Sequence, residues 1–202
     1  MVNAEVAIFA RLPVAGKVKT RLAAGVGFEN AATFYKACAE HIFAETSRID
    51  HRDRAQAQKG HMCVMQALVI GTDIPDISAS ILDRAVAALE SHQLVLGPAF
   101  DGGYYLLGTT CAALQLFEGI EWSSDKVLQQ TLQQAKALQL NVAPLDTLPT
   151  LEDIDTLQTL HGHELADLGK GITEPEGRSP THTVQPQLWF GKELHLLQLH
   201  LN

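Results

Sequence analysis

The sequence is short of cysteine and of long apolar runs, and each shortage excludes a class of protein. The three cysteines, Cys38, Cys63 and Cys111, are far apart and form no Cys-x-x-Cys pair. This excludes a disulfide framework and a conventional zinc ribbon, and it is typical of a reducing cytoplasm. No apolar run approaches the roughly 18–20 residues that a membrane-spanning helix needs, and the N-terminal segment lacks the basic start of a signal peptide. We therefore expect a cytoplasmic protein with no membrane partner.

Basic residues are also scarce relative to acidic ones. The 202 residues include 15 Lys and Arg against 23 Asp and Glu, for a net charge of −8. An acidic surface repels nucleic acid, so we expect no nucleic-acid partner. Any anion that the protein binds must meet a local basic patch.

Several common catalytic motifs are absent. The sequence has no Walker A loop and no Gly-x-Gly-x-x-Gly fingerprint, which argues against a P-loop or a Rossmann dinucleotide site. It also lacks the His-Glu-x-x-His pattern of zinc proteases and the Gly-x-Ser-x-Gly elbow of serine hydrolases. The function must therefore be inferred from other residues.

Apolar periodicity predicts alternating strands and helices, the pattern of an α/β protein with a mostly parallel sheet. The predicted strands cover residues 5–10, 65–71, 93–97, 104–108 and 141–145. The predicted helices cover residues 30–49, 78–90, 126–138 and 151–168, with Asn30 and Ser78 as candidate N-caps. Ligands of such folds bind in the loops that follow the strands.

Two stretches depart from this pattern. The polar residues 46–60 contain no run that could form a strand. Residues 171–202 begin with a proline-rich segment that is typical of a loop or tail, and they end in an apolar stretch that fits helix and strand equally well. We predict a domain over residues 1–170, followed by a tail.

The segment from residue 11 to residue 27, predicted to be a loop, concentrates positive charge just after the first strand. Arg11, Lys17, Lys19 and Arg21 fall within eleven residues of an otherwise acidic chain, together with Gly16 and Thr20. Cationic side chains neutralise phosphates, arginine can bind two oxygens at once, and glycine lets backbone N–H groups approach. The loop is either a polyphosphate site or a solvated basic surface.

Aspartates follow or lie near later predicted strands. Asp73 ends a buried strand in Gly-Thr-Asp-x-Pro, where it could bind Mg²⁺ or Mn²⁺ or stabilise a turn. Asp101 precedes Gly102 and Gly103, which could allow close approach of a ligand or form a plain turn. Asp153 and Asp155 share one side of an extended segment, or one of them caps a helix. Basic residues and metal-binding acids together predict a phosphate-transferring or phosphate-releasing site.

Ordered motifs carry a resemblance to a known family. These are Phe-Ala-Arg-x-Pro-x-x-Gly-Lys-Val-Lys-Thr-Arg-Leu (9–22), Ile-Gly-Thr-Asp-x-Pro (70–75), Gly-Pro-Ala-x-Asp-Gly-Gly-Tyr-Tyr-Leu-x-Gly (97–108), Phe-x-Gly-Ile-x-Trp-Ser (117–123) and Asp-Ile-Asp-Thr (153–156). Together they resemble the glycosyltransferase-like family of radical-SAM/selenodomain-associated transferases. That family is similar to molybdenum-cofactor and 2-phospholactate guanylyltransferases and to the nucleotide-diphospho-sugar transferase (GT-A) superfamily.

The resemblance implies a three-layer αβα sandwich, GT-A or Rossmann-like, with a nucleotide bound at the carboxyl edge of the sheet. It implies a nucleotide or nucleotide-sugar donor, a small-molecule acceptor, and Mg²⁺ or Mn²⁺. The implied nucleotide-binding residues are Arg11, Gly16, Lys17, Lys19, Thr20 and Arg21, and the implied metal ligands are Asp73, Asp153 and Asp155. The implied catalytic residues are Lys19, Arg21 and Asp101, and the implied pocket residues are Gly102, Gly103, Tyr104 and Trp122.

One departure from the family leaves three functions open. Relatives carry a Gln-x-x-Gly-Asp-Leu-Gly-x-Arg signature and further strands before the Asp73 strand, whereas this chain has no such signature there. We therefore expect that strands present in the relatives are missing between residues 46 and 64 of this chain. The leading interpretation is a metal-dependent glycosyltransferase. The alternatives are a nucleotidyltransferase that releases pyrophosphate and a catalytically degenerate nucleotide-binding remnant.

Overall fold

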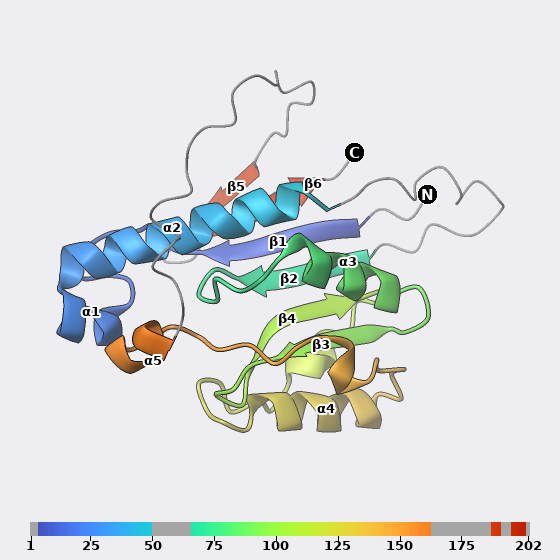
Figure 1. Ribbon diagram of the computed structural model, residues 1–202. Coiled ribbons are helices and arrows are strands. Elements are labelled where there is room, and N and C mark those ends of the chain that lie inside the picture. Colours follow the sequence, from blue (N-terminus) through green and yellow to red (C-terminus); the bar gives the residue numbers. More distant parts are fainter. Residues whose placement is uncertain (1–3, 50–65, 163–186, 191–194, 201–202) are drawn as a thin grey trace, which may run out of the picture.

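A six-stranded sheet forms the centre of the computed structural model, which describes residues 4–49, 66–162, 187–190 and 195–200 (Figure 1). The strands are β1 (Ala4–Ala10), β2 (Gln66–Gly71), β3 (Leu94–Pro98), β4 (Tyr104–Thr109), β5 (Gln187–Phe190) and β6 (His195–His200). The α-helices are α1 (Thr20–Val26), α2 (Phe28–Ser47), α3 (Ala79–Ala88), α4 (Val127–Ala137) and α5 (Leu157–Gly162). Two 3₁₀ turns are η2 (Leu114–Phe117) and η3 (Leu145–Thr147).

The sheet order is β3-β4-β2-β1-β6-β5, and only the β1–β2 pairing among these strands is parallel. The prediction of a mostly parallel sheet is therefore wrong. The reason is that β4 returns through the short turn at residues 99–103 and inserts between β3 and β2, while β6 runs antiparallel to β1. Strands β1, β2 and β3 still point the same way, so the loops that follow them meet at one edge of the sheet.

Apolar side chains of adjacent strand residues pack into two different clusters. Val95 and Leu106 join the main cluster with residues of α2 and α3, such as Ile42 and Leu82. Their strand neighbours Leu94, Leu96 and Leu107 pack against Leu116 of η2 and Ala135 of α4. Because neighbouring strand residues face opposite sides of a sheet, helices cover both faces around β3 and β4. Three layers over the whole sheet remain a prediction.

Most predicted elements are present within two residues of their expected bounds, and four predictions differ from the structure. The predicted loop 11–27 contains α1, whose Leu22 and Ala23 pack against Ala31 of α2. Residues 141–145 form no strand; Val142 makes a single bridge to Leu94, and η3 follows.

The third and fourth differences concern the C-terminal part of the chain. The predicted helix 151–168 begins only at Leu157, because Leu151 pairs with Ala99 and residues 152–156 form no helix; residues 163–168 lie outside the described part. Within the predicted tail, β5 and β6 extend the sheet beyond β1. Strands were expected to be missing between residues 46 and 64; residues 46 and 47 belong to α2, and residues 50–64 lie outside the described residues, as does the boundary near residue 170.

Both predicted helix caps differ in detail from the structure. Gly27, not Asn30, is the N-cap of α2, and the Asn30 side-chain amide donates to the carbonyl of Val26 at 2.8 Å. Ser78 does occupy the N-cap position of α3, but its hydroxyl makes no cap bond. The carboxylate of Glu45 in α2 accepts the N–H of Ala79 instead, at 2.8 Å. Among the helices that the structure describes, none is long and apolar enough to cross a membrane.

Candidate functional site

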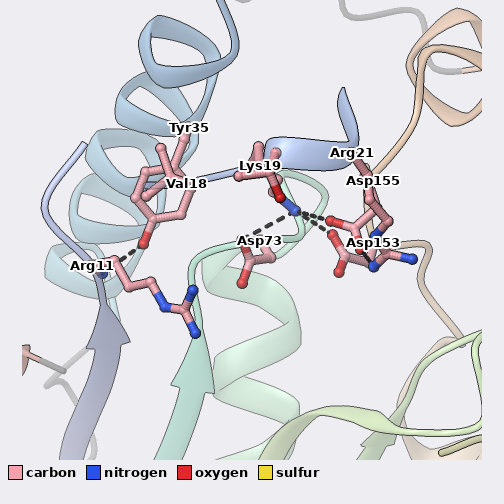
Figure 2. A pocket seen from close by; sticks show the side chains of 9 residues that line it. Arg11, Val18, Lys19, Arg21, Tyr35, Asp73, Asp153 and Asp155 are labelled. Carbon is pink, nitrogen blue, oxygen red and sulfur yellow. Dashed lines mark hydrogen bonds and ion pairs between the residues drawn. The ribbon is translucent and has the colours of Figure 1, made fainter. Parts of the chain in front are cut away.

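A cavity of about 300 Å³ opens where β1 and β2 end (Figure 2). Such a volume is at the lower end of the range of small-molecule sites. The residues that line it are Arg11, Val18, Lys19, Thr20, Arg21, Tyr35, Asp73, Asp153 and Asp155. Three cationic and three anionic side chains therefore converge from three separate segments of the chain, and Tyr35 comes from a fourth.

The ammonium group of Lys19 lies at the centre of the three carboxylates (Figure 2). Its Nζ atom is 3.0 Å from Asp73 Oδ1, 2.6 Å from Asp153 Oδ1 and 2.9 Å from Asp155 Oδ1. The Lys19 side chain is only 3% exposed. The ammonium donates hydrogen bonds to Asp153 and Asp155 and forms an ion pair with Asp73, and such compensation is the condition for keeping a charged amine inside a protein.

The backbone of Lys19 contributes to this placement. Lys19 adopts φ 46° and ψ 45°, the left-handed region that is unfavourable for a residue with a Cβ atom. It stands at the N-cap position of α1, and Leu22 and Ala23 of that helix are buried. Packing of α1 therefore holds Lys19 in a strained conformation with its side chain among the acids.

Arg21 adds a second cation on the outer side of the cluster. Its guanidinium forms an ion pair with Asp155 through Oδ2, the oxygen that Lys19 does not contact. The Arg21 side chain is mostly exposed, so solvent weakens this pair. The three aspartates and the two cations together carry a net charge of −1.

The protein environment makes the Asp153 carboxyl harder to ionise, and the main cause is burial. Burial raises the pKa of the Asp153 carboxyl, and the adjacent Lys19 ammonium opposes that rise. The negative charges of Asp73 and Asp101 raise the pKa further. Removing Lys19 would leave this carboxyl among like charges, so the ionised cluster depends on a cation at its centre.

Arg11 and Tyr35 form the other wall of the cavity. The Arg11 backbone N–H donates to the Tyr35 hydroxyl at 2.7 Å, and this hydroxyl lies 2.8 Å from Thr72 Oγ1. Thr72 donates in turn to the carbonyl of Phe9 at 3.3 Å. Tyr35 thus connects the loop that follows β1 with the residue before Asp73. Figure 2 shows the Arg11 guanidinium extending into the cavity.

The donor set fits a divalent cation. Carboxylate oxygens are ligands that Mg²⁺ and Mn²⁺ prefer, and the Lys19 ammonium is a cation already held by three of them. No group of three His, Cys, Asp or Glu side chains in the described ranges is drawn together closely enough to hold a metal as the structure stands. The carboxylates are spaced around an ammonium and would have to close in on a metal ion.

Seven of the predicted site residues lie together in this cavity: Arg11, Lys19, Thr20, Arg21, Asp73, Asp153 and Asp155. Gly16 and Lys17 belong to the same loop but do not line the cavity, and both are exposed. Gly16 has φ 78°, so it supplies the turn that directs the chain toward Lys19.

Asp101, predicted to be catalytic, and the four predicted pocket residues lie outside the lining of this cavity. Asp101 Oδ1 accepts the N–H of Gly103 at 2.9 Å, the bond of a plain Asx turn, although Asp101 stays close enough to influence the pKa of Asp153. Gly102 has φ 87°, and a Cβ atom there would lie 2.1 Å from the Asp125 carbonyl oxygen, so the backbone packs closely at this position.

The two aromatic residues of that prediction point elsewhere. Tyr104 packs with the cluster under α4. Trp122 is 55% exposed and lies beside Phe117, with ring centroids 6.3 Å apart. Neither residue lines this cavity, and their role as pocket walls stays a prediction.

Val18 and Tyr35 line the cavity but were not among the predicted site residues. Tyr35 fits the apolar face of α2, and that pattern indicates only a core residue. A tyrosine on a buried helix face could have indicated a further role, because its buried hydroxyl needs a hydrogen-bond partner. Nothing in the sequence showed that the partners would be Arg11 and Thr72.

Comparison with known proteins agrees with this architecture. No curated protein matches this chain. One solved structure that does match is described as a "putative nucleotide-diphospho-sugar transferase" from Desulfovibrio desulfuricans G20. The two are 26% identical with a TM-score of 0.62, and the match covers 75% of this chain and 81% of the other. The chain therefore has a nucleotide-diphospho-sugar transferase-like fold.

A family profile also matches the sequence, over residues 10–124. This range contains Arg11, Lys19, Arg21 and Asp73 of the cavity and ends before Asp153 and Asp155. Because the match covers more than half of the 202 residues, the chain belongs to the family described as "Uncharacterized protein conserved in bacteria (DUF2064)".

Proposed function

We propose that this protein is a metal-dependent transferase that passes a glycosyl group from a nucleotide-diphospho-sugar to a small-molecule acceptor. One observation carries the proposal: the cations of Arg11, Lys19 and Arg21 and the acids Asp73, Asp153 and Asp155 line a single cavity at the carboxyl ends of two parallel strands. Cations that can bind a diphosphate thus lie beside acids that can bind a divalent ion. The description of the matching Desulfovibrio structure supports the donor class.

The reaction exchanges one bond for another. The acceptor nucleophile forms a bond to the anomeric carbon of the sugar, and the bond from that carbon to the diphosphate oxygen breaks. The nucleoside diphosphate leaves with the electron pair, and Arg11, Lys19 and Arg21 stabilise the negative charge that it gains. The acceptor loses a proton, for which the carboxylate of Asp101 is the candidate base because its loop adjoins the Asp153 segment.

Asp73, Asp153 and Asp155 are the residues that would hold Mg²⁺ or Mn²⁺. A bound divalent ion supplies further neutralisation of the departing diphosphate. Thr20 lines the cavity at the first residue of α1 and offers a hydroxyl donor to a phosphate oxygen.

A thermal-shift screen tests the donor class. Nucleoside diphosphates and triphosphates and UDP- and GDP-sugars are each added with and without Mn²⁺. We expect the midpoint to rise only when the metal and one nucleotide are both present, since a ligand that binds the folded state stabilises it. A flat response to every compound would favour a degenerate remnant.

The variant Arg11→Met, with Lys136→Met as its control, tests whether nucleotides bind in this cavity. The Arg11 guanidinium lines the cavity and has no ion pair among the described residues, whereas Lys136 is exposed on α4 and lies outside the lining. We expect Arg11→Met to weaken nucleotide binding at least about tenfold, roughly 1.4 kcal/mol. Lys136→Met should bind as the wild type does; equal affinity in all three proteins would contradict the assignment.

The released product distinguishes the two transfer reactions. Glycosyl transfer releases a nucleoside diphosphate, whereas nucleotidyl transfer releases pyrophosphate. Incubation of the wild type with the nucleotide found in the screen and an acceptor, followed by chromatography of the products, separates them. Pyrophosphate as the product would replace the glycosyltransferase proposal with nucleotidyl transfer.

A further inference from the structure

The central position of Lys19 bears on how a metal reaches the acids. The ammonium is buried and lies within 3.0 Å of one oxygen from each of Asp73, Asp153 and Asp155. These three carboxylates are also the proposed metal ligands. An ammonium and a divalent ion cannot share the centre of one cluster, because like charges at such short distances repel strongly in a partly buried site.

We propose that Lys19 and the divalent ion are alternative occupants of this cluster, and that metal binding releases the Lys19 ammonium toward the phosphates in the cavity. The inference deepens the proposed function and depends on it for the nature of the anion. In the metal-free protein Lys19 is an internal counter-ion. In the metal-bound protein it becomes a phosphate-binding cation.

The charges of the cluster favour this exchange. Three carboxylates with Lys19 and Arg21 sum to −1. Replacing the single charge of Lys19 with the double charge of the metal brings the cluster to zero. The released ammonium then adds to Arg11, so the cavity gains positive charge when a diphosphate has to be held.

The geometry also permits the exchange. The Asp73 side chain is 50% exposed, so an incoming ion can contact one carboxylate from solvent before Lys19 leaves. The lysine side chain is flexible, and its ammonium is readily hydrated, so it can move out of the cluster without a change in the backbone. Arg21 binds the outer oxygen of Asp155 and does not occupy the centre.

Mn²⁺ binding by two charge-matched variants tests the proposal. Lys19→Met and Arg21→Met each remove one positive charge from the cluster, but only the first vacates its centre. Free Mn²⁺ is measured by electron paramagnetic resonance at pH 7 without nucleotide. We expect Lys19→Met to bind Mn²⁺ at least about tenfold more tightly than the wild type, and Arg21→Met to gain less than about threefold.

Amine labelling of the wild type tests the same exchange without a mutation. Lys19 is protected from an amine-reactive reagent while its ammonium is buried, and exposed Lys17 two residues away is the internal reference. Mass spectrometry of the labelled peptides should show that Mg²⁺ increases modification of Lys19 severalfold and leaves Lys17 unchanged. This measurement remains informative if Lys19→Met fails to fold.

Three results would overturn the inference: unchanged or weaker Mn²⁺ binding by a folded Lys19→Met, equal gains in both variants, or no effect of Mg²⁺ on Lys19 labelling. None of them requires turnover or a nucleotide. If the wild type transfers sugar but Mg²⁺ does not change the labelling of Lys19, only this inference is refuted. Metal-dependent exposure of Lys19 in a protein that binds no nucleotide refutes only the proposed function.

Discussion

The hydroxyl of Tyr35 connects the loop that follows β1 with Thr72, the residue before Asp73, while its ring is buried in the core. The hydrogen bonds form a chain in which each group donates to the next: the Arg11 N–H to the tyrosine hydroxyl, that hydroxyl to Thr72, and Thr72 to the Phe9 carbonyl. This path starts in the loop after β1 and returns to β1. The position of Arg11 therefore depends on a helix residue 24 positions away.

Tyr35→Phe should cost stability and ligand affinity together. It leaves the Arg11 N–H without its acceptor, for which we expect a loss of about 1–2 kcal/mol in the free energy of unfolding. The nucleotide-dependent thermal shift should also shrink. Tyr105→Phe is the control, because that buried hydroxyl donates to the Pro149 carbonyl outside the cavity lining. A full nucleotide response in Tyr35→Phe would contradict the proposed role.

Cys38 is buried in α2 and should be inert. Burial raises the pKa of its thiol to about 12, so the reactive thiolate is scarce at ordinary pH. We expect no alkylation of Cys38 by iodoacetamide between pH 7 and pH 10 in the folded protein, and full alkylation in guanidinium. Cys111, which is only partly buried, is the reference thiol in the same peptide map. Native labelling of Cys38 would show that α2 opens readily.

Among the helices, α2 and α3 are joined by an unusual cap. Glu45 is buried in α2 and accepts the N–H of Ala79 at the start of α3, while its other oxygen pairs with Arg48. A carboxylate is favourable at a helix N-terminus because the free N–H groups there carry partial positive charge. Glu45 thus replaces the side-chain cap that Ser78 does not make.

Glu45→Ala should therefore destabilise the protein by about 1–2 kcal/mol, the usual cost of losing a helix cap. The comparison is Glu40→Ala on the same helix, whose carboxylate is exposed and, among the residues that the structure describes, forms an ion pair with Lys36 alone, at 3.6 Å. Such surface pairs contribute less than about 1 kcal/mol. Urea denaturation of both variants measures the difference, and equal losses would contradict the capping role.

Across the whole molecule, the C-terminal strands complete the sheet. β6 pairs with β1 from Glu5 to Ala10, on the side opposite β2. Without it, the edge of β1 that faces away from β2 would present unpaired backbone groups from Glu5 to Ala10. Such edges promote association between chains. The predicted tail thus includes strands that protect the strand from which the Arg11 loop starts.

Truncation after residue 170 tests this role. We expect the shortened chain to elute partly as oligomers or aggregates in size-exclusion chromatography and to unfold at a lower temperature than the full chain. Leu197→Pro is a milder test, because position 197 pairs with β1 and with β5 and proline removes the backbone donor there. A monomeric truncated chain of unchanged stability would contradict it.

Local sequence patterns predicted most elements. Strands β1 to β4 and helices α2, α3 and α4 follow from apolar periodicity, which reports the buried face of each element. The helix α1 was missed because its seven residues are too short to be stable alone, and contact with α2 decides their conformation. The motif residues were also evident, since charge and glycine spacing can be read directly from the chain.

Tertiary structure alone decided what those residues face. The alternation of strands and helices predicted that β1, β2 and β3 run in the same direction. It did not predict that β4 inserts between β3 and β2, because the partners of a strand depend on how all strands of the sheet assemble. Likewise, the spacing of Asp153 and Asp155 predicted that both side chains lie on one side of the same segment. It did not show that Lys19, 134 residues from Asp153, would lie between them and Asp73. Residue chemistry is local, whereas the pairing of charges depends on contacts that form only when distant segments pack together.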